Sequence, residues 1–293
     1  MPSDSMEWRC YQALGNRYLI APPDAIFAKK NIIIDACSAC HSDGLLIGSR
    51  LQLASADLRI WNPDGSEAEM SGNGVRIFAK FLLDNNFWKM SGGKIATIGG
   101  IASCGFLANG DVTARMAPPL VAADKLILLT QFGPIAGYVV FWGNPHLAIP
   151  VDEFPQNWRR VAAILSRHPH FPKKINVHFL RILHKRSIAL RIFERGVGET
   201  SSCGSGAAAC AAVANRHLGC DATLRVNMVG GTLHVTIAKN FLQLAGPVVQ
   251  VSIGSNHLPL APAAAGRCRS AAKFSEGGIA LLGRRITRKN TAS

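Results

Sequence analysis

The sequence lacks any long apolar run. No stretch of about 18 uninterrupted apolar residues, the length that a membrane-spanning helix needs, occurs among its 293 residues. The first residues, MPSDSMEWRC, also lack the order of basic and then apolar residues that marks a secretory signal. We therefore expect a cytoplasmic protein with no membrane partner, large enough for one or two hydrophobic cores.

Acidic residues are also few. The chain has 18 acidic and 32 basic side chains, and its net charge of +14 raises the question of a nucleic-acid partner. Much of the excess lies in residues 257–293, where Glu276 is the only acidic residue in a stretch rich in Ala, Gly, Pro and Ser. We expect this segment to be a flexible basic tail. We therefore do not expect nucleic acid as the main partner. Binding of nucleic acid by the basic tail is the alternative.

Signatures of metals and cofactors are missing or incomplete. Cys37-Ser-Ala-Cys-His41 matches the C-x-x-C-H pattern of covalent haem attachment, but that reaction needs export. A zinc site on the same residues lacks a second pair of ligands at finger-like spacing. No Walker or Rossmann glycine pattern stands out. Without an export signal, the eight cysteines are expected to be reduced thiols. We expect neither a metal nor a cofactor.

The sequence does contain an internal near-repeat. Gly15-Asn16 is followed by Ser71-Gly-Asn-Gly and the helix-like run VRIFAKFLLDN. Gly143-Asn144 is followed, at nearly the same spacing, by Cys203-Gly-Ser-Gly and AAACAAVANRHLG. Both runs are apolar around most of their circumference, which is typical of a helix enclosed by other structure.

Short strands are expected around each helix, because the flanking segments alternate in polarity or are rich in Val, Ile and Thr, with Gly or Asn-Gly between them. The predicted strands are 31–34, 51–61, 94–98, 101–106, 112–116, 137–141, 148–151, 175–180, 187–194, 223–229, 231–238 and 241–251. We therefore predict an α+β fold of two pseudo-symmetric domains, each an antiparallel β-sheet or barrel wrapped around a central α-helix. The boundary is expected near residues 122–127.

Each predicted helix begins with a residue that can exchange a proton, followed by glycine-rich backbone. Free N–H groups and partial positive charge at a helix N-terminus hold carboxylates well. The same field is expected to lower the pKa of a thiol such as Cys203. Two such termini facing one carboxylate would stabilise negative charge that develops at the adjacent carbon. For one motif alone, a helix cap is the better interpretation; two at matching positions favour a catalytic site.

Several segments identify a family resemblance. Asn62-Pro-Asp-Gly-Ser-Glu-Ala-Glu-Met-Ser-Gly-Asn-Gly, Gly143-Asn-Pro-His, Ile175-Asn-Val and Glu194-Arg-Gly-Val-Gly-Glu-Thr-Ser-Ser-Cys-Gly-Ser-Gly resemble signature stretches of diaminopimelate epimerase. The similarity runs in order from Gly15-Asn16 to Gly246-Pro-Val. It implies domains of residues 1–124 with 247–256, in which the final strand returns to the first domain, and of 125–246. Residues 257–293 are the tail.

The resemblance also implies a reaction and a set of roles. The family interconverts LL- and meso-diaminopimelate by moving a proton at the α-carbon, without pyridoxal phosphate or another cofactor, in lysine and peptidoglycan precursor synthesis, and it forms homodimers. Cys203 and position 71 would be the two bases. The implied substrate-binding residues are Gly72, Asn73, Gly204 and Ser205 for the reacting carboxylate, His146 and Glu194 near the amino group, and Asn16, Asn62, Asn144, Asn176 and Arg195 for the far end.

The sequence departs from the family at one of the two bases, where Ser71 replaces a cysteine. A serine hydroxyl is far less acidic than a thiol and usually needs an adjacent base. Ser71 is either activated in place, or the activity is reduced or lost, or the chemistry has changed to elimination, as in the hydroxyproline dehydratases of the related proline racemase group. We favour the first, because the substrate-recognition residues are intact.

Smaller departures affect the expected side-chain preference. The family's opening His-Gly-x-Gly-Asn reads Gln12-Ala-Leu-Gly-Asn here, followed by Arg17. Three hypotheses follow: an epimerase acting on diaminopimelate, a related racemase, isomerase or dehydratase acting on another amino acid, and a non-catalytic protein whose basic tail contacts nucleic acid.

Overall fold

The computed structural model describes residues 8–21 and 30–252, and the predicted basic tail lies outside them. We use "first half" for the part from β1 to β8 and "second half" for the part from β10 to β18. The elements of the first half are β1 (Arg9–Ala13), β2 (Asn16–Ile20), α1 (Lys30–Ala39), β3 (Leu45–Gln52), β4 (Ser55–Trp61), β5 (Glu67–Ala68), α2 (Gly72–Asp84), β6 (Gly93–Thr97), β7 (Gly100–Phe106) and β8 (Val112–Met116).

The second half repeats this order after one additional strand, β10. After β9 (Leu120–Val121), its elements are β10 (Leu126–Thr130), β11 (Gly133–Trp142), β12 (Asn144–Pro150), α3 (Trp158–Ser166), β13 (Asn176–His184), β14 (Ser187–Glu194), β15 (Gly198–Glu199), α4 (Gly204–His217), β16 (Thr223–Met228), β17 (Gly231–Ile237) and β18 (Leu242–Gly246), and β19 (Val249–Val251) follows.

The strand pairings of the two halves correspond, except that β10, which pairs with β11, has no counterpart in the first half. The antiparallel hairpin β1–β2 matches β11–β12, and the parallel pair β2–β3 matches β12–β13. The antiparallel pair β3–β4 and the parallel pair β4–β6 match β13–β14 and β14–β16. The prediction of an α+β fold with two pseudo-symmetric parts is confirmed, although parallel pairs occur in each sheet.

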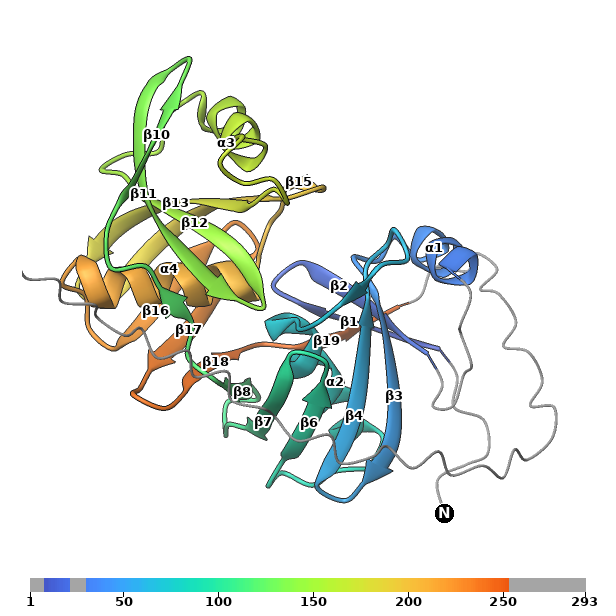
Figure 1. Cartoon of the computed structure of the whole chain (residues 1–293). Helices are drawn as coiled ribbons and strands as arrows, with labels where there is room; N and C mark the ends of the chain where they lie inside the picture. Colours follow the sequence, from blue (N-terminus) through green and yellow to red (C-terminus); the bar gives the residue numbers. More distant parts are fainter. Residues whose placement is uncertain (1–7, 22–29, 253–293) are drawn as a thin grey trace, which may run out of the picture. The chain divides into compact units, whose positions relative to one another are not determined.

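Each half surrounds one helix, as the apolar circumference of both helices predicts. Helix α2 contacts β1, β2, β3, β4, β6, β7 and β8, and α4 contacts β11, β12, β13, β14, β16, β17 and β18 (Figure 1). Buried residues occupy every side of α2 from Gly72 to Ala79, and the small side chains of α4 from Ala207 to Ala212 let the strands approach closely.

Two short strands cross between the halves. β9 leaves the first half after β8 and pairs with β11, whereas β19 leaves the second half after β18 and pairs with β1. Strands β8 and β18 also pair with each other directly. The final strand, β19, thus pairs with a strand of the first half, and the family resemblance implies the same return to the first domain.

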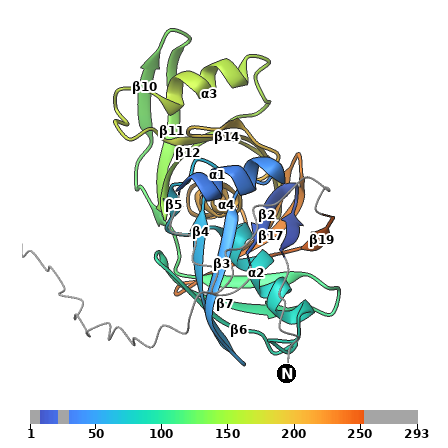
Figure 2. The same ribbon diagram turned by 90° about the vertical axis from the view of Figure 1, so that its right-hand side faces the viewer.

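The structure differs from the sequence prediction in the N-terminal region. Residues 31–34, predicted as a strand from their run of isoleucines, belong to helix α1, which lies against β3 (Figure 2). The side chains of Ile33, Ala36, Cys37 and Cys40 are buried, and this spacing is helical. The predicted strand 51–61 is divided by a turn between β3 and β4.

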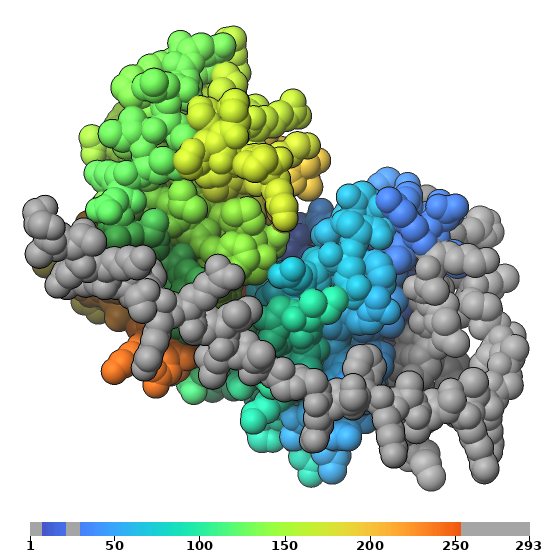
Figure 3. Space-filling model, viewed as in Figure 1, coloured from blue at the N-terminus to red at the C-terminus, as the bar shows by residue number. Residues whose placement is uncertain are grey.

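The outer face of the second half carries α3, which contacts β10, β13 and β14. In the space-filling view, this region is the green and yellow group of atoms (Figure 3). Trp158, Val161 and Leu165 bury one face of α3 in a separate apolar cluster with Phe179. Among the described residues, no helix has the length and apolar character required to cross a bilayer.

Candidate active site

The N-termini of α2 and α4 lie against each other at the centre of the candidate site. Ser71 and Cys203 are the N-cap residues, and each side chain accepts a hydrogen bond from a backbone N–H of its own helix. A β-carbon added to Gly204 would stand 3.1 Å from the backbone nitrogen of Asn73. The glycine therefore permits the close approach of the two termini, and their positive ends converge on one region.

On the α4 side, the Cys203 thiol donates a hydrogen bond to Oε2 of Glu194 at 3.3 Å and lies 3.4 Å from Oγ of Ser205. Oε1 of the same carboxylate accepts a bond of 2.7 Å from the Thr200 hydroxyl. Cys203 is only 6% exposed. The Glu194 residue keeps some exposed surface, but its carboxylate is enclosed.

Burial raises the pKa of the Cys203 thiol well above its usual range, and the Glu194 carboxylate raises it further. Burial also raises the pKa of Glu194. This corrects the expectation that the helix terminus lowers the pKa of this thiol. Loss of solvation and a neighbouring anion outweigh the field of the helix.

On the α2 side, Ser71 Oγ accepts a hydrogen bond from the Gly74 N–H at 3.0 Å and another from the Tyr18 hydroxyl at 3.1 Å. Tyr18 belongs to β2 and is 7% exposed. Burial raises the pKa of its phenol strongly. Because Ser71 Oγ accepts both bonds, its own hydrogen is available for a third partner.

A chain of polar side chains supports the start of α2. Nη2 of Arg76 donates to Oδ1 of Asn73 at 3.0 Å, and the Asn73 amide donates to Oδ1 of Asn16 at 3.2 Å. The Asn16 amide donates in turn to Oδ2 of Asp43 at 3.0 Å. Arg76 is fully buried, and burial lowers its pKa to about 10. This chain joins two predicted substrate-binding residues.

A second polar group lies at the ends of β12, β13 and β14. Nη2 of Arg195 donates to Oδ1 of Asn144 at 2.6 Å, and the backbone N–H of Arg195 donates to Oδ1 of Asn176 at 2.9 Å. Three of the predicted residues are thus in direct contact. Asn62 is separate from them, since its amide donates to Ser66 Oγ in its own turn at 3.0 Å.

His146 and His178 form a buried pair. Nδ1 of His146 lies 2.9 Å from Nε2 of His178, and both side chains are fully enclosed. Burial lowers both pKa values, that of His178 to about 3, and His178 and Arg195 lower that of His146 further. A β-carbon on Gly206 would stand 2.4 Å from Cε1 of His178, so the start of α4 and this pair require a glycine there.

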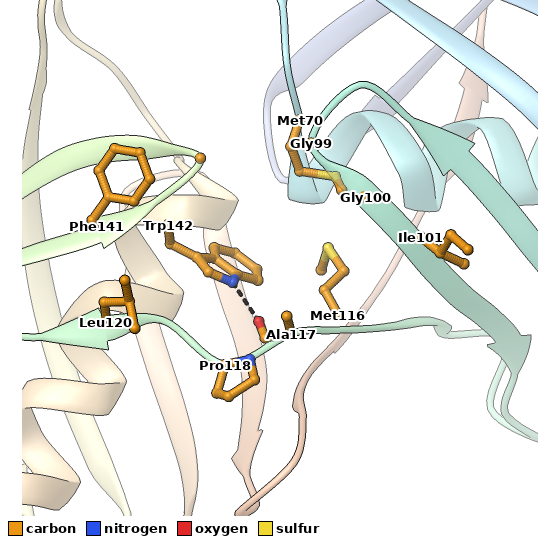
Figure 4. Close-up of a pocket in the computed structure, with 11 residues that line it drawn as sticks. Met70, Gly99, Gly100, Ile101, Met116, Ala117, Pro118, Leu120, Phe141 and Trp142 are labelled. Carbon is orange, nitrogen blue, oxygen red and sulfur yellow. Dashed lines mark hydrogen bonds between the residues drawn. The ribbon is translucent and has the colours of Figure 1, made fainter. Parts of the chain in front are cut away.

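An apolar hollow of 220 Å³ is lined by Met70 and Gly143, which directly precede Ser71 and Asn144 in the chain, but by none of the predicted site residues themselves. Trp142 lines it and donates from Nε1 to the carbonyl oxygen of Ala117 at 2.6 Å (Figure 4). The hollow has too few polar groups to orient an amino acid. We therefore place the candidate active site at the helix N-termini.

Two residues that were not predicted from the sequence, Tyr18 and His178, contact predicted site residues. A signal for each was present. Tyr18 follows Asn16 by two positions on β2, and His178 follows Asn176 by two positions on β13. Side chains two positions apart on a strand share a face. Tyr18 and His178 could therefore have been predicted as site residues from their spacing to Asn16 and Asn176.

Comparison with known proteins agrees with this architecture. The family model for diaminopimelate epimerase matches residues 21–121 and 138–258, which include Ser71 and Cys203. "Diaminopimelate epimerase 2" of Nostoc sp. is 34% identical over 256 residues, covering 80% of this chain and 90% of that protein. The diaminopimelate epimerase of Halorhodospira halophila is 32% identical over 287 residues, covering 89% and 99%.

Solved structures share the fold at lower identity. A phenazine biosynthesis protein of the PhzF family from Bacillus anthracis aligns with a TM-score of 0.61 and 18% identity, covering 84% of this chain and 95% of that one. A hydroxyproline epimerase from Agrobacterium vitis aligns with a TM-score of 0.58 and 16% identity, covering 83% and 91%. The sequence matches extend over most of the chain, and the protein belongs to the diaminopimelate epimerase family of isomerases.

Proposed function

We propose that this protein interconverts LL- and meso-diaminopimelate by moving a proton from one face of the α-carbon to the other, without a cofactor. The observation that carries the proposal is the meeting of two glycine-rich helix N-termini, one capped by Cys203 and the other by Ser71. Sequence matches to proteins named diaminopimelate epimerase indicate the substrate.

The helix termini make the α-proton of the substrate easier to remove. Backbone N–H groups of Gly72, Asn73, Gly204 and Ser205 bind the carboxylate beside the reacting carbon. As the α-proton leaves, negative charge spreads into that carboxylate, and fixed N–H dipoles stabilise it without reorganisation. Cys203 removes or returns the proton on one face, and Ser71 serves the other face.

Glu194 links the pKa of the Cys203 thiol to the presence of substrate. Before substrate binds, burial and, to a lesser extent, the Glu194 carboxylate hold the thiol protonated. The α-ammonium group of a substrate placed beside Glu194 and His146 offsets the carboxylate charge, and so favours the thiolate when substrate is present. The neutral state of His146 leaves the ammonium group without a competing cation.

The far end of the substrate carries a second ammonium and carboxylate pair. Arg195 pairs with that carboxylate, while the amide groups of Asn16, Asn62, Asn144 and Asn176 supply oriented donors and acceptors. The contacts of Arg195 with Asn144 and Asn176 support this assignment, because the bond to Asn144 orients the guanidinium and the bond to Asn176 holds the backbone of Arg195 before binding. An amino acid without the distal pair leaves these groups unpaired and is rejected.

The proposal extends to the pathway, the cellular compartment and the oligomeric state of the protein. A diaminopimelate epimerase supplies precursors of lysine and peptidoglycan, and we place it in the cytoplasm as a homodimer. Exposed apolar side chains such as Ile98, Ile101 and Phe141 are available for contact with a second copy.

The proposal is tested by incubating the purified protein separately with LL- and meso-diaminopimelate and following isomer composition by NMR. Interconversion from both isomers is expected, and Cys203→Ala is expected to abolish it. Cys210→Ala is the matched control, because Cys210 is a fully buried thiol on the same helix. No interconversion by the wild type, or conversion of hydroxyproline instead, would contradict the substrate assignment.

A further inference from the structure

A serine at the second base position poses a chemical problem that the rest of the site has to solve. A serine hydroxyl is a much weaker acid than a thiol, and its alkoxide is not populated near neutral pH without help. The help has to come from a group in contact with Ser71 Oγ. Among the described residues, the side chain that donates a hydrogen bond to this atom is Tyr18.

The Tyr18 hydroxyl is placed for that role. It lies 3.1 Å from Ser71 Oγ, and the Gly74 N–H holds the same oxygen from its own helix at 3.0 Å. Tyr18 is almost fully enclosed, so bulk water does not compete for its hydroxyl. β2 pairs with β1 on one side and with β3 on the other, which fixes the backbone of Tyr18.

We propose that Tyr18 is the positioning residue that makes Ser71 a working proton donor and acceptor, and that the phenol and the hydroxyl together replace a second thiol. This inference rests on the proposed function and deepens it. In this inference, the phenol of Tyr18 is the source of the proton that Ser71 delivers to one face of the substrate.

The proton balance is complete without another reactant. On one face, Cys203 as thiolate takes the α-proton and becomes a thiol. On the other face, the O–H bond of Ser71 breaks as a new C–H bond forms at the α-carbon, and the Tyr18 proton moves to Ser71 Oγ. The phenol ends as phenolate, so one negative charge has passed from sulfur to the phenol oxygen. The reverse reaction starts from that phenolate and the Cys203 thiol.

The electrostatics of the site keep Tyr18 a protonated donor to Ser71 before the reaction starts. Burial raises the pKa of Tyr18, and the charges of Glu194, Asp43 and Cys203 raise it further. The influence of Cys203 means that thiolate and phenolate disfavour each other, as alternating bases must. The Ser71 hydroxyl acts in the opposite direction and lowers the pKa of Tyr18, since it can donate to the phenolate.

The test is a double-mutant cycle on epimerase turnover. Tyr18→Phe in the wild-type background is expected to lower kcat about 100-fold or more with little change in KM. In the Ser71→Cys background, where a thiol no longer needs the phenol, the same substitution is expected to change kcat less than about threefold. Tyr11→Phe is the matched control, because Tyr11 is a buried tyrosine that donates to Asp84 at the other end of α2.

A proton inventory in mixtures of H₂O and D₂O separates the relay from a structural effect. The wild type is expected to give a curved dependence of kcat on deuterium fraction, because two protons move together, and Ser71→Cys a linear one. An equal loss in both backgrounds, or no loss in Tyr18→Phe, would overturn the inference while active wild type preserves the proposed function. Inactive wild type would overturn both.

Discussion

The Cys203 thiol donates its hydrogen bond to a carboxylate, that of Glu194, at 3.3 Å. A thiol held in this way is protonated in the resting protein, since its burial and the anion beside it both oppose formation of a thiolate. The pair therefore links thiol reactivity to whatever positive charge enters the site, which for an amino-acid substrate is the ammonium group.

Glu194→Gln is predicted to lower the pKa of Cys203, because it removes a negative charge from a buried neighbour. The pH dependence of alkylation at Cys203, followed by peptide mass spectrometry, measures this directly and does not depend on turnover. Glu199→Gln is the control, because Glu199 is an exposed carboxylate paired with Arg159. An unchanged or raised midpoint in Glu194→Gln would show that burial alone sets the pKa.

Ser71→Ala is predicted to separate two roles of one oxygen. Loss of the N-cap acceptor for the Gly74 N–H should reduce the free energy of unfolding by about 1 kcal/mol. Loss of the second proton donor should lower the rate of inversion about 100-fold or more. Urea unfolding and turnover assays measure the two effects. Asn157→Ala is the cap control, because Asn157 starts α3 without a side-chain capping bond and should cost little stability.

The buried histidine pair predicts acid sensitivity. Burial lowers the pKa of His178 from 6.5 to about 3 in the folded protein. The unfolded chain therefore binds a proton that the folded one does not, and stability that is complete above pH 6.5 falls as the pH approaches 3. His178→Gln should reduce this slope by about 1.4 kcal/mol per pH unit in that window. Urea unfolding at several pH values checks it, with the exposed His184→Gln as control.

Arg76 is predicted to help substrate binding by holding Asn73, although its buried charge lowers the free energy of unfolding. Its Nε and Nη1 atoms have no hydrogen-bond partner among the described residues, and Nη2 holds Asn73. Arg76→Met removes a poorly compensated buried charge, so the free energy of unfolding should not fall. KM should rise about tenfold, because the Asn73 amide loses its anchor. A large loss of stability with an unchanged KM would contradict this assignment.

Local sequence pattern was sufficient for the two central helices and their caps. A Ser or Cys before a glycine-rich start, followed by a run that is apolar on all sides, has few other structural solutions. The same kind of pattern gave the β8 segment, Val112–Met116, with its bounds. It was wrong for α1, where three successive isoleucines favour a strand locally and packing of Ile33, Ala36 and Cys37 favours a helix.

The side-chain pairs of the site could not be derived in this way. Tyr18 and Ser71 are 53 positions apart, and His146 and His178 are 32 apart. Which residues meet depends on the register of the parallel pairs β2–β3 and β12–β13, and on the approach of two helix ends. These are properties of the assembled fold, and so are the close approaches of Asn73 to Gly204 and of His178 to Gly206, which explain why these two positions are glycines.

The position of deuterium after partial reaction in D₂O tests the central claim, that two different groups exchange protons on opposite faces. Starting from LL-diaminopimelate, the wild type is predicted to place deuterium at the inverted carbon of newly formed meso isomer, while recovered LL substrate stays unlabelled at early times. Deuterium in recovered LL substrate without formation of meso isomer would mean that Cys203 acts alone, and would contradict the account of Ser71 as the second proton carrier.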